Sequence, residues 1–144
     1  MFQGALRWLA RRAAHTTVTV PVSDAHPPFA RYAHATGVPA RARLVFASGQ
    51  LGITPAGAIP ATAEAQAALA FANVAAVLRA AGARLEDVVR LNAFVTAPEH
   101  LQGYMRARDA AFGAAPPTAS TLMVVAGFAR PEVLVEGEAV AALP

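Results

Sequence analysis

The apolar residues of this chain follow two different spacings, which predict its strands and its helices. Alternating or β-branched apolar residues, typical of strands, occur at 16–22, 41–48, 85–96, 118–125 and 133–141. Apolar residues three and four positions apart, typical of helices with one buried face, occur at 63–81 and 98–112. The predicted order is two strands, an irregular excursion at 50–59 around a Pro-Ala-Gly turn, then helix, strand, helix and two strands.

Both predicted helices carry recognisable end signals. Thr62 can cap the first helix with its hydroxyl, and Gly82 permits the left-handed conformation that commonly follows a last turn. Pro98 opens the second helix, because proline is tolerated at a first helical position. The predicted buried faces consist of Ala67, Ala70, Phe71, Val74, Val77, Leu78 and Ala81 in the first helix, and of Leu101, Tyr104, Met105, part of Arg108 and Phe112 in the second.

Each predicted helix lies between two strands, and connections of this length join parallel strands. The pattern predicts an α+β fold, a two-layer mixed sheet with two helices on one face, formed by residues 16–144 after a tail at 1–15. On the uncovered face the strand at 85–96 presents Arg90, Asn92 and Phe94. That face must meet either water or another subunit.

Alanine dominates the apolar composition, with 38 of the 144 residues, and cysteine is absent. So little bulky apolar material gives a thin core, and we therefore expect burial between subunits. No apolar run approaches the about 18 residues that a membrane helix needs. The lack of cysteine excludes disulfides and thiolate chemistry and is compatible with the reducing cytoplasm, where we expect the protein.

The net charge of +3 comes from the tail. Arg7, Arg11 and Arg12 lie within residues 1–15, which contain no acid, whereas the rest of the chain contains nine arginines and nine acids. A neutral folded part lacks the clustered cations that bind a phosphate backbone, so we expect no nucleic-acid partner. The arginine-rich tail has the composition of an organellar transit peptide, and a frayed terminus is the other interpretation.

Familiar catalytic motifs are missing from the sequence. It contains no glycine-rich nucleotide loop, phosphate loop, zinc-protease helix or serine nucleophile elbow. The histidines show no ligand spacing, so we expect no metal site. They are His15, His26, His34 and His100.

Two details remain as candidate chemistry. Gly49 ends a strand and has no side chain to keep a ligand from its amide, although an ordinary exit from the strand gives the same pattern. Glu136 and Glu138 share one face of the last strand. They are surface charges if that face is in water, and one of them can carry a proton with a perturbed pKa if an interface buries it.

Together these segments resemble the RidA family, also called YjgF or L-PSP. The resemblance extends from about residue 27 to 142 and is carried by the segments 31–35, 47–52, 66–73, 81–82, 87–95, 117–121 and 135–140. It implies a chorismate-mutase-like fold, a homotrimer and small-molecule clefts at the subunit interfaces. It also implies hydrolysis of enamines or imines to a 2-oxo acid and ammonia without a cofactor. The neutral folded part gives no support to the ribonuclease activity sometimes ascribed to the family.

Carried over position by position, the resemblance implies a small site. Tyr32 matches the cleft tyrosine, and Ser48 and Gly49 match the strand end whose amide meets the ligand. Thr121 matches a residue whose backbone amide faces the ligand. Glu136 matches the glutamate that handles a water molecule, and it is the implied catalytic residue.

Two positions depart from the family pattern. Ala119 stands where the family has an arginine that clamps the substrate carboxylate, and Met105 replaces a cleft asparagine. A more apolar cleft without this clamp favours an electrophile that lacks a carboxylate, with a non-catalytic binding or structural protein as the alternative. Arg31 and Arg130 could contact an anion at the cleft rim, but arginines on loops would bind it weakly.

Overall fold

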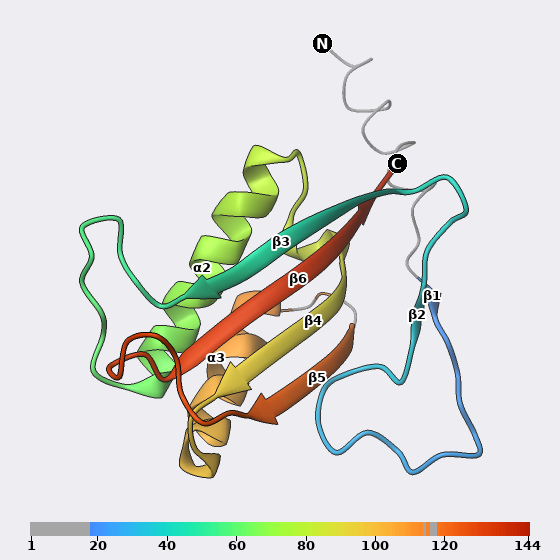
Figure 1. Ribbon diagram of the computed structural model, residues 1–144. Coiled ribbons are helices and arrows are strands. Elements are labelled where there is room, and N and C mark those ends of the chain that lie inside the picture. The colour runs from blue at the N-terminus through green and yellow to red at the C-terminus, as the bar shows by residue number, and fades with distance from the viewer. Residues whose placement is uncertain (1–17, 114, 116–117) are drawn as a thin grey trace.

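The computed structural model describes residues 18–113, 115 and 118–144 and shows a four-stranded sheet with two helices packed on one face (Figure 1). A separate two-stranded ribbon precedes this sheet in the chain. The strands are β1 (Val18–Thr19), β2 (Thr36–Gly37), β3 (Arg43–Leu51), β4 (Val88–Val95), β5 (Ala119–Val124) and β6 (Val135–Leu143). The helices are α2 (Ala63–Ala80) and α3 (Leu101–Phe112), with two short 3₁₀ helices at Leu85–Asp87 and Pro98–His100.

The strand order in the larger sheet is β3-β6-β4-β5, so the last strand of the chain lies inside the sheet. β6 runs antiparallel to both β3 and β4, and β4 runs parallel to β5. Helix α3 therefore joins two neighbouring parallel strands, whereas the connection through α2 passes over β6. This arrangement confirms the predicted α+β fold with both helices on one face (Figure 1).

The core lies between the helices and the sheet, and much of it is alanine. Leu91, Ala93 and Val95 of β4 are fully buried there. The helices cover them with Phe71, Val74, Leu78 and Tyr104, while Ala47, Ala67, Ala139 and Ala141 fill the remaining space. The stripe predicted for the first helix is confirmed except at Val77, which is 37% exposed, and at Ala81, which is only partly buried. In the second helix Tyr104 and Arg108 are buried, and the other predicted residues are partly buried.

Of the described residues in the strand predicted at 16–22, only Val18–Thr19 form a strand, and two predicted boundaries in the main sheet are wrong by three residues. Gly49 does not end its strand, because β3 continues through a bulge and its residues Gln50 and Leu51 pair with β6. Residues 85–87 form a 3₁₀ turn instead of strand, since the side chain of Asp87 accepts a hydrogen bond from the backbone N–H of Arg84 at 2.9 Å. Both corrections depend on partners that alternation along the chain does not specify.

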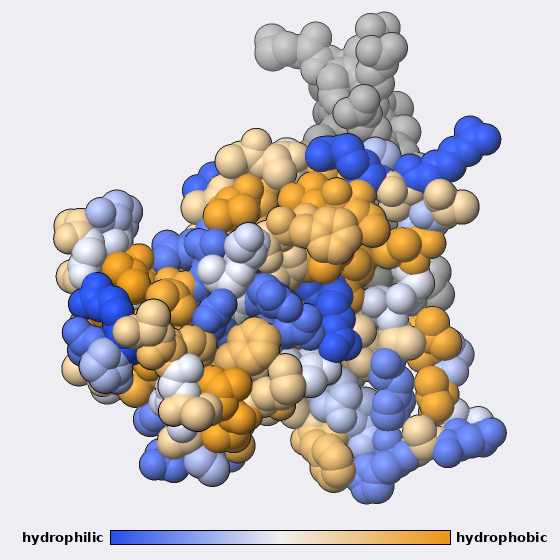
Figure 2. Space-filling model, in the orientation of Figure 1, coloured by the Kyte–Doolittle hydropathy of each residue, from blue (hydrophilic) through white to orange (hydrophobic). Residues whose placement is uncertain are grey.

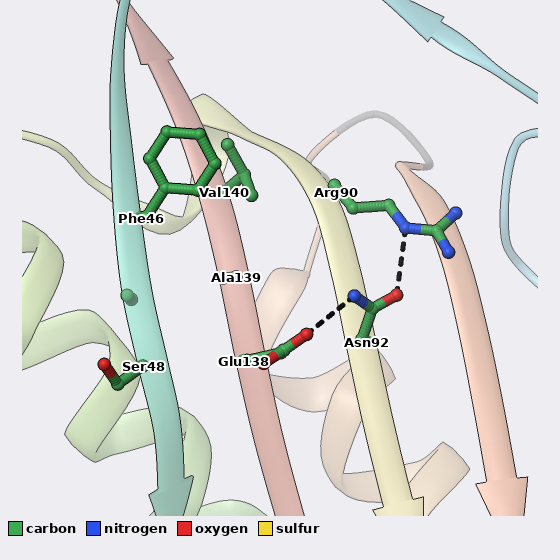
Figure 3. Close-up of a pocket in the computed structure, with 8 residues that line it drawn as sticks. Phe46, Ser48, Arg90, Asn92, Glu138, Ala139 and Val140 are labelled. Atoms are coloured by element: carbon green, nitrogen blue, oxygen red, sulfur yellow. Dashed lines mark hydrogen bonds between the residues drawn. The ribbon is translucent and has the colours of Figure 1, made fainter.

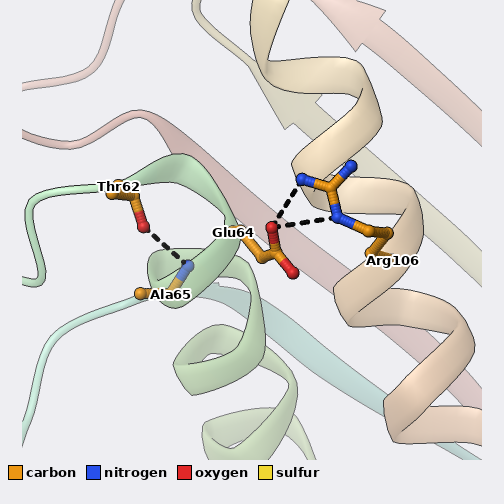
Figure 4. A network of polar contacts seen from close by, with 4 residues as sticks. All are labelled: Thr62, Glu64, Ala65 and Arg106. Atoms are coloured by element: carbon orange, nitrogen blue, oxygen red, sulfur yellow. Dashed lines mark hydrogen bonds and ion pairs between the residues drawn. The ribbon is translucent and has the colours of Figure 1, made fainter.

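The first turn of α2 forms as its sequence predicts and also contacts α3 (Figure 4). The hydroxyl of Thr62 accepts a hydrogen bond from the backbone N–H of Ala65 at 3.2 Å. Arg106 of α3 donates to Oε2 of Glu64 from Nε at 3.0 Å and from Nη2 at 2.6 Å, and this contact lowers the pKa of the Glu64 carboxyl. The second helix begins later than predicted, because the turn after Pro98 is 3₁₀ and the α-helix starts at Leu101.

A buried amide on α2 fixes the start of β6. The side chain of Gln66 is 1% exposed, and its Nε2 donates to the carbonyls of Pro60 and Glu132, each at 2.8 Å. Its Oε1 accepts from the backbone N–H of Leu134, also at 2.8 Å. One side chain therefore joins the helix to the segments before α2 and before β6.

The predicted tail at 1–15 lies outside the described residues, as do the first two residues of the strand predicted at 16–22. None of the helices in the described part of the chain is long and apolar enough to cross a membrane.

Candidate functional site

The sheet face opposite the helices carries polar side chains at its centre and apolar ones around them (Figure 2). Register places the side chains of this face in rows across the strands. One row consists of Phe46, Val140, Arg90 and Ala119, the next includes Glu138, Asn92 and Thr121, and the third includes Glu136, Phe94 and Met123. The predicted uncovered face is therefore confirmed, and Glu136 and Glu138 do share it.

The central polar residues form one hydrogen-bonded network (Figure 3). Arg90 donates from Nε to Oδ1 of Asn92 at 2.9 Å and from Nη2 to Oγ1 of Thr121 at 2.6 Å. Nδ2 of Asn92 donates to Oε1 of Glu138 at 2.8 Å. The network spans β5, β4 and β6. Alternation along the strands predicted the face of its residues, but these contacts between strands had no signal in the sequence.

A hollow of about 250 Å³ lies over this network, large enough for a small metabolite. Its polar lining includes Ser48, Arg90, Asn92 and Glu138, and its apolar wall includes Phe46 and Val140. The Phe46 side chain is 73% exposed at the rim, and Figure 3 shows it on the β3 side of the hollow, away from Arg90.

Glu136 lies beside β3, where Gly49 makes room for its carboxyl group. A Cβ atom built on Gly49 would overlap Oε1 of Glu136. Partial burial and then the negative charge of Glu138 raise the pKa of the Glu136 carboxyl above its ordinary value of 4.5. A carboxyl group with a raised pKa can accept and return a proton closer to neutral pH.

The tyrosine singled out in the sequence lies at the opposite edge of the sheet. Ala33 forms a parallel bridge with Ala119, and its backbone N–H donates to the carbonyl of Thr118 at 2.9 Å. Tyr32 is thus placed beside β5, where its ring meets that of His34 edge-on at 6.4 Å.

The predicted site residues therefore fall into two groups. Ser48, Gly49 and Glu136 lie on β3 and β6, whereas Tyr32, Ala119 and Thr121 lie on or beside β5. β3 and β5 are the two edges of the sheet. With strands about 4.8 Å apart, three spacings separate these edges by about 14 Å, too far for one small ligand to contact both within a single chain.

The other predicted residues lie away from the open face. Met105 packs against the core from α3. Arg31 donates from Nη2 to the carbonyl of Ala115 at 2.5 Å and lines a small hollow on the helix side of β5. The exposed Arg130 pairs with Glu132 at 3.2 Å. Within the described ranges, no group of three or more histidine or acidic side chains is placed to hold a metal ion.

The model of the endoribonuclease L-PSP family matches residues 22–143. Sequence relatives match over a shorter segment that spans 42% of their length. One of them is the Escherichia coli protein named "Putative reactive intermediate deaminase TdcF", 41% identical over 54 residues, which are 37% of this chain.

Solved structures match over most of the chain. YyfB from Yersinia pestis, described as a protein of unknown function of the Rid family, is 30% identical with a TM-score of 0.77, and the match covers 90% of this chain and 99% of YyfB. Escherichia coli TdcF, solved with bound serine, is 26% identical with a TM-score of 0.67, covering 88% of this chain and 99% of TdcF. The residues matched by the family model, 22–143, include all four strands of the main sheet and both helices.

Proposed function

Since the chain belongs to the endoribonuclease L-PSP family, which includes the RidA proteins, we propose that it hydrolyses small enamines, imines or related electrophiles without a cofactor. The site would lie between subunits of a homotrimer. The observation that carries the proposal is the half-buried Glu136, whose carboxyl group has a raised pKa and lies against Gly49. Ser48, the residue before Gly49, lines the hollow. The relative named as a reactive intermediate deaminase supports the same chemistry.

The separation of the predicted residues supports a site made by two chains. If the β5 edge of one subunit meets the β3 edge of the next, Tyr32 and Thr121 of one chain face Ser48, Gly49 and Glu136 of its neighbour. An interface between two different edges leaves each subunit with a free edge for the next subunit, so such contacts can close into a ring. A trimer is one such ring. The open face also exposes large apolar side chains that such packing would cover, among them Leu44, Phe46 and Met123.

The proposed reaction adds water across the C=N bond. The water oxygen attacks the carbon while Glu136 takes one proton from the water and passes it to the nitrogen, which gives a carbinolamine. Glu136 then takes the hydroxyl proton as the C=O bond forms and gives it to the nitrogen as the C–N bond breaks, so that ammonia leaves and a carbonyl compound remains. Backbone N–H groups at Gly49, which has no register partner on β6, and at Thr121 on the edge strand would polarise the ligand.

The alternative is a family member that binds a small molecule without turning it over. Ala119 favours this alternative, because a methyl group contributes no donor to the site. In either case the lack of cysteine suits a reducing compartment, and we place the protein in the cytoplasm.

The test is ammonia release from freshly generated 2-aminoacrylate and from neutral imines, with and without the protein. We expect acceleration by the wild type, loss of at least about 100-fold in Glu136→Gln, and no change in Glu86→Gln, which alters an exposed glutamate elsewhere. Ligand binding without acceleration would establish the non-catalytic alternative. Sedimentation at micromolar concentration should give a trimer, and a monomer would contradict the shared site.

A further inference from the structure

Arg90 lies beside the position where the sequence lacks a ligand-binding arginine. Arg90 and Ala119 are register partners on the parallel strands β4 and β5, so their side chains leave the same face of the sheet. The hydrogen bond from Nη2 of Arg90 to Oγ1 of Thr121 holds the guanidinium toward β5. Figure 3 shows the Arg90 side chain extending from β4 on the side away from β6. A cation therefore stands over the strand edge that Ala119 leaves without one.

The guanidinium of Arg90 has unused binding capacity. Its partners, Oδ1 of Asn92 and Oγ1 of Thr121, are neutral oxygens, and Arg90 forms no ion pair within the described residues. Two of the five N–H donors of a guanidinium are occupied by these contacts, and the others remain for a further acceptor. A carboxylate is the acceptor that matches them best in charge and in geometry.

The network also holds Arg90 in place, and Glu138 bonds to Asn92 and not to Arg90. Asn92 accepts from Arg90 with its oxygen and donates to Glu138 with its nitrogen, so both of its partners fix the amide. Glu138 is thereby engaged through Asn92, and it does not neutralise Arg90 directly. An arginine held on a strand loses less side-chain freedom on binding than the exposed, loop-borne Arg130.

We propose that Arg90 binds the carboxylate of the ligand, so that the site selects small 2-oxo acids and the 2-imino acids that yield them. The proposal rests on the proposed function for the position of the cleft, and it replaces the sequence-based expectation of a ligand without a carboxylate. In the family pattern the arginine stands on β5, at the position of Ala119. Here the cation stands on the neighbouring strand β4, where Thr121 and Asn92 orient it.

The test compares a carboxylate with its neutral counterpart. Calorimetric titration of the full-length protein with 2-oxobutyrate and with 2-oxobutanamide measures the contribution of the negative charge. Arg90→Gln removes the cation and keeps a hydrogen-bonding side chain, whereas Arg90→Lys keeps the cation. Arg79→Gln is the matched control, because Arg79 is exposed on α2. Circular dichroism and sedimentation establish that each variant is folded and assembled as the wild type is.

We expect the wild type to prefer 2-oxobutyrate to the amide, Arg90→Gln to bind 2-oxobutyrate at least about tenfold more weakly, and Arg90→Lys to fall between them. Adding Ala119→Arg to Arg90→Gln should restore binding, since both positions share one row of the sheet. Unchanged 2-oxobutyrate binding in Arg90→Gln, or no preference for the carboxylate in the wild type, overturns the assignment and leaves Arg90 as a link between β4 and β5.

The two proposals fail separately. If the wild type binds 2-oxobutyrate through Arg90 but does not accelerate imine hydrolysis, the proposed reaction is wrong and the carboxylate site stands. If imines with and without a carboxylate are hydrolysed equally fast, and Arg90→Gln changes neither rate, the reaction stands and the role of Arg90 is wrong.

Discussion

The carboxyl group of Glu136 occupies the space that a side chain at Gly49 would need. The two residues come from different strands, β3 and β6, which pair in antiparallel register with a bulge at this point. The bulge and the missing side chain together let the carboxyl group lie against the backbone of β3. The glycine thus positions the implied catalytic group as well as leaving its own amide open.

Gly49→Ala should therefore impair catalysis more than folding. The new methyl group must displace the flexible Glu136 side chain, which costs little stability but moves the carboxyl group, so we expect kcat/KM for imine hydrolysis to fall about 10- to 100-fold. Gly137→Ala is the control on β6, because its added Cβ meets no atom within 4 Å. Equal losses in the two variants would show that the overlap with Glu136 has no functional role.

The stability of Glu136→Gln should depend on pH. Because the pKa of Glu136 is raised in the folded protein, the folded state holds the proton more tightly than the unfolded chain does as pH rises above 4.5. Wild-type stability therefore falls through that window, and glutamine removes the penalty. We expect the variant to melt about 1 to 3 °C higher than the wild type at pH 7 and equally at pH 4 by scanning calorimetry. A variant that is less stable at pH 7 would contradict the burial-based shift.

Removing the buried amide of Gln66 should destabilise the protein strongly. Gln66→Ala leaves the carbonyls of Pro60 and Glu132 and the N–H of Leu134 without their partner, and we expect a loss of about 2 to 4 kcal/mol in urea unfolding at fixed protein concentration. The control is Gln102→Ala, an exposed position on α3 that should change stability by less than about 0.5 kcal/mol. Similar losses at both sites would mean that the amide network contributes little.

The tail should be dispensable for the folded domain. Deletion of residues 1–15 removes three arginines and no part of the predicted packing pattern. We expect the melting temperature and the oligomeric state measured by sedimentation to remain nearly unchanged, whereas the isoelectric point falls. A large drop in melting temperature would show that the tail docks on the domain.

Local patterns in the sequence were enough to identify both helices, the strands of the main sheet and the face on which its polar residues lie. Thr62 and Gly82 act at the ends of α2 as expected, since Gly82 has a φ of 81°. These features depend on residues close to each other in the chain: a cap bonds within one turn, and alternation fixes which side chains share a face. The resemblance at the motif positions supplied the implied site residues.

Only the tertiary structure decided which strands are neighbours. Alternation gives every strand two faces but does not order the strands, so the insertion of β6 between β3 and β4 could not be read from the chain. That order places Glu136 against Gly49, leaves Thr121 on the far edge, and brings Arg90 beside Ala119. Hydrogen bonds between segments far apart in sequence determine these relationships, and the geometry of the candidate site follows from them.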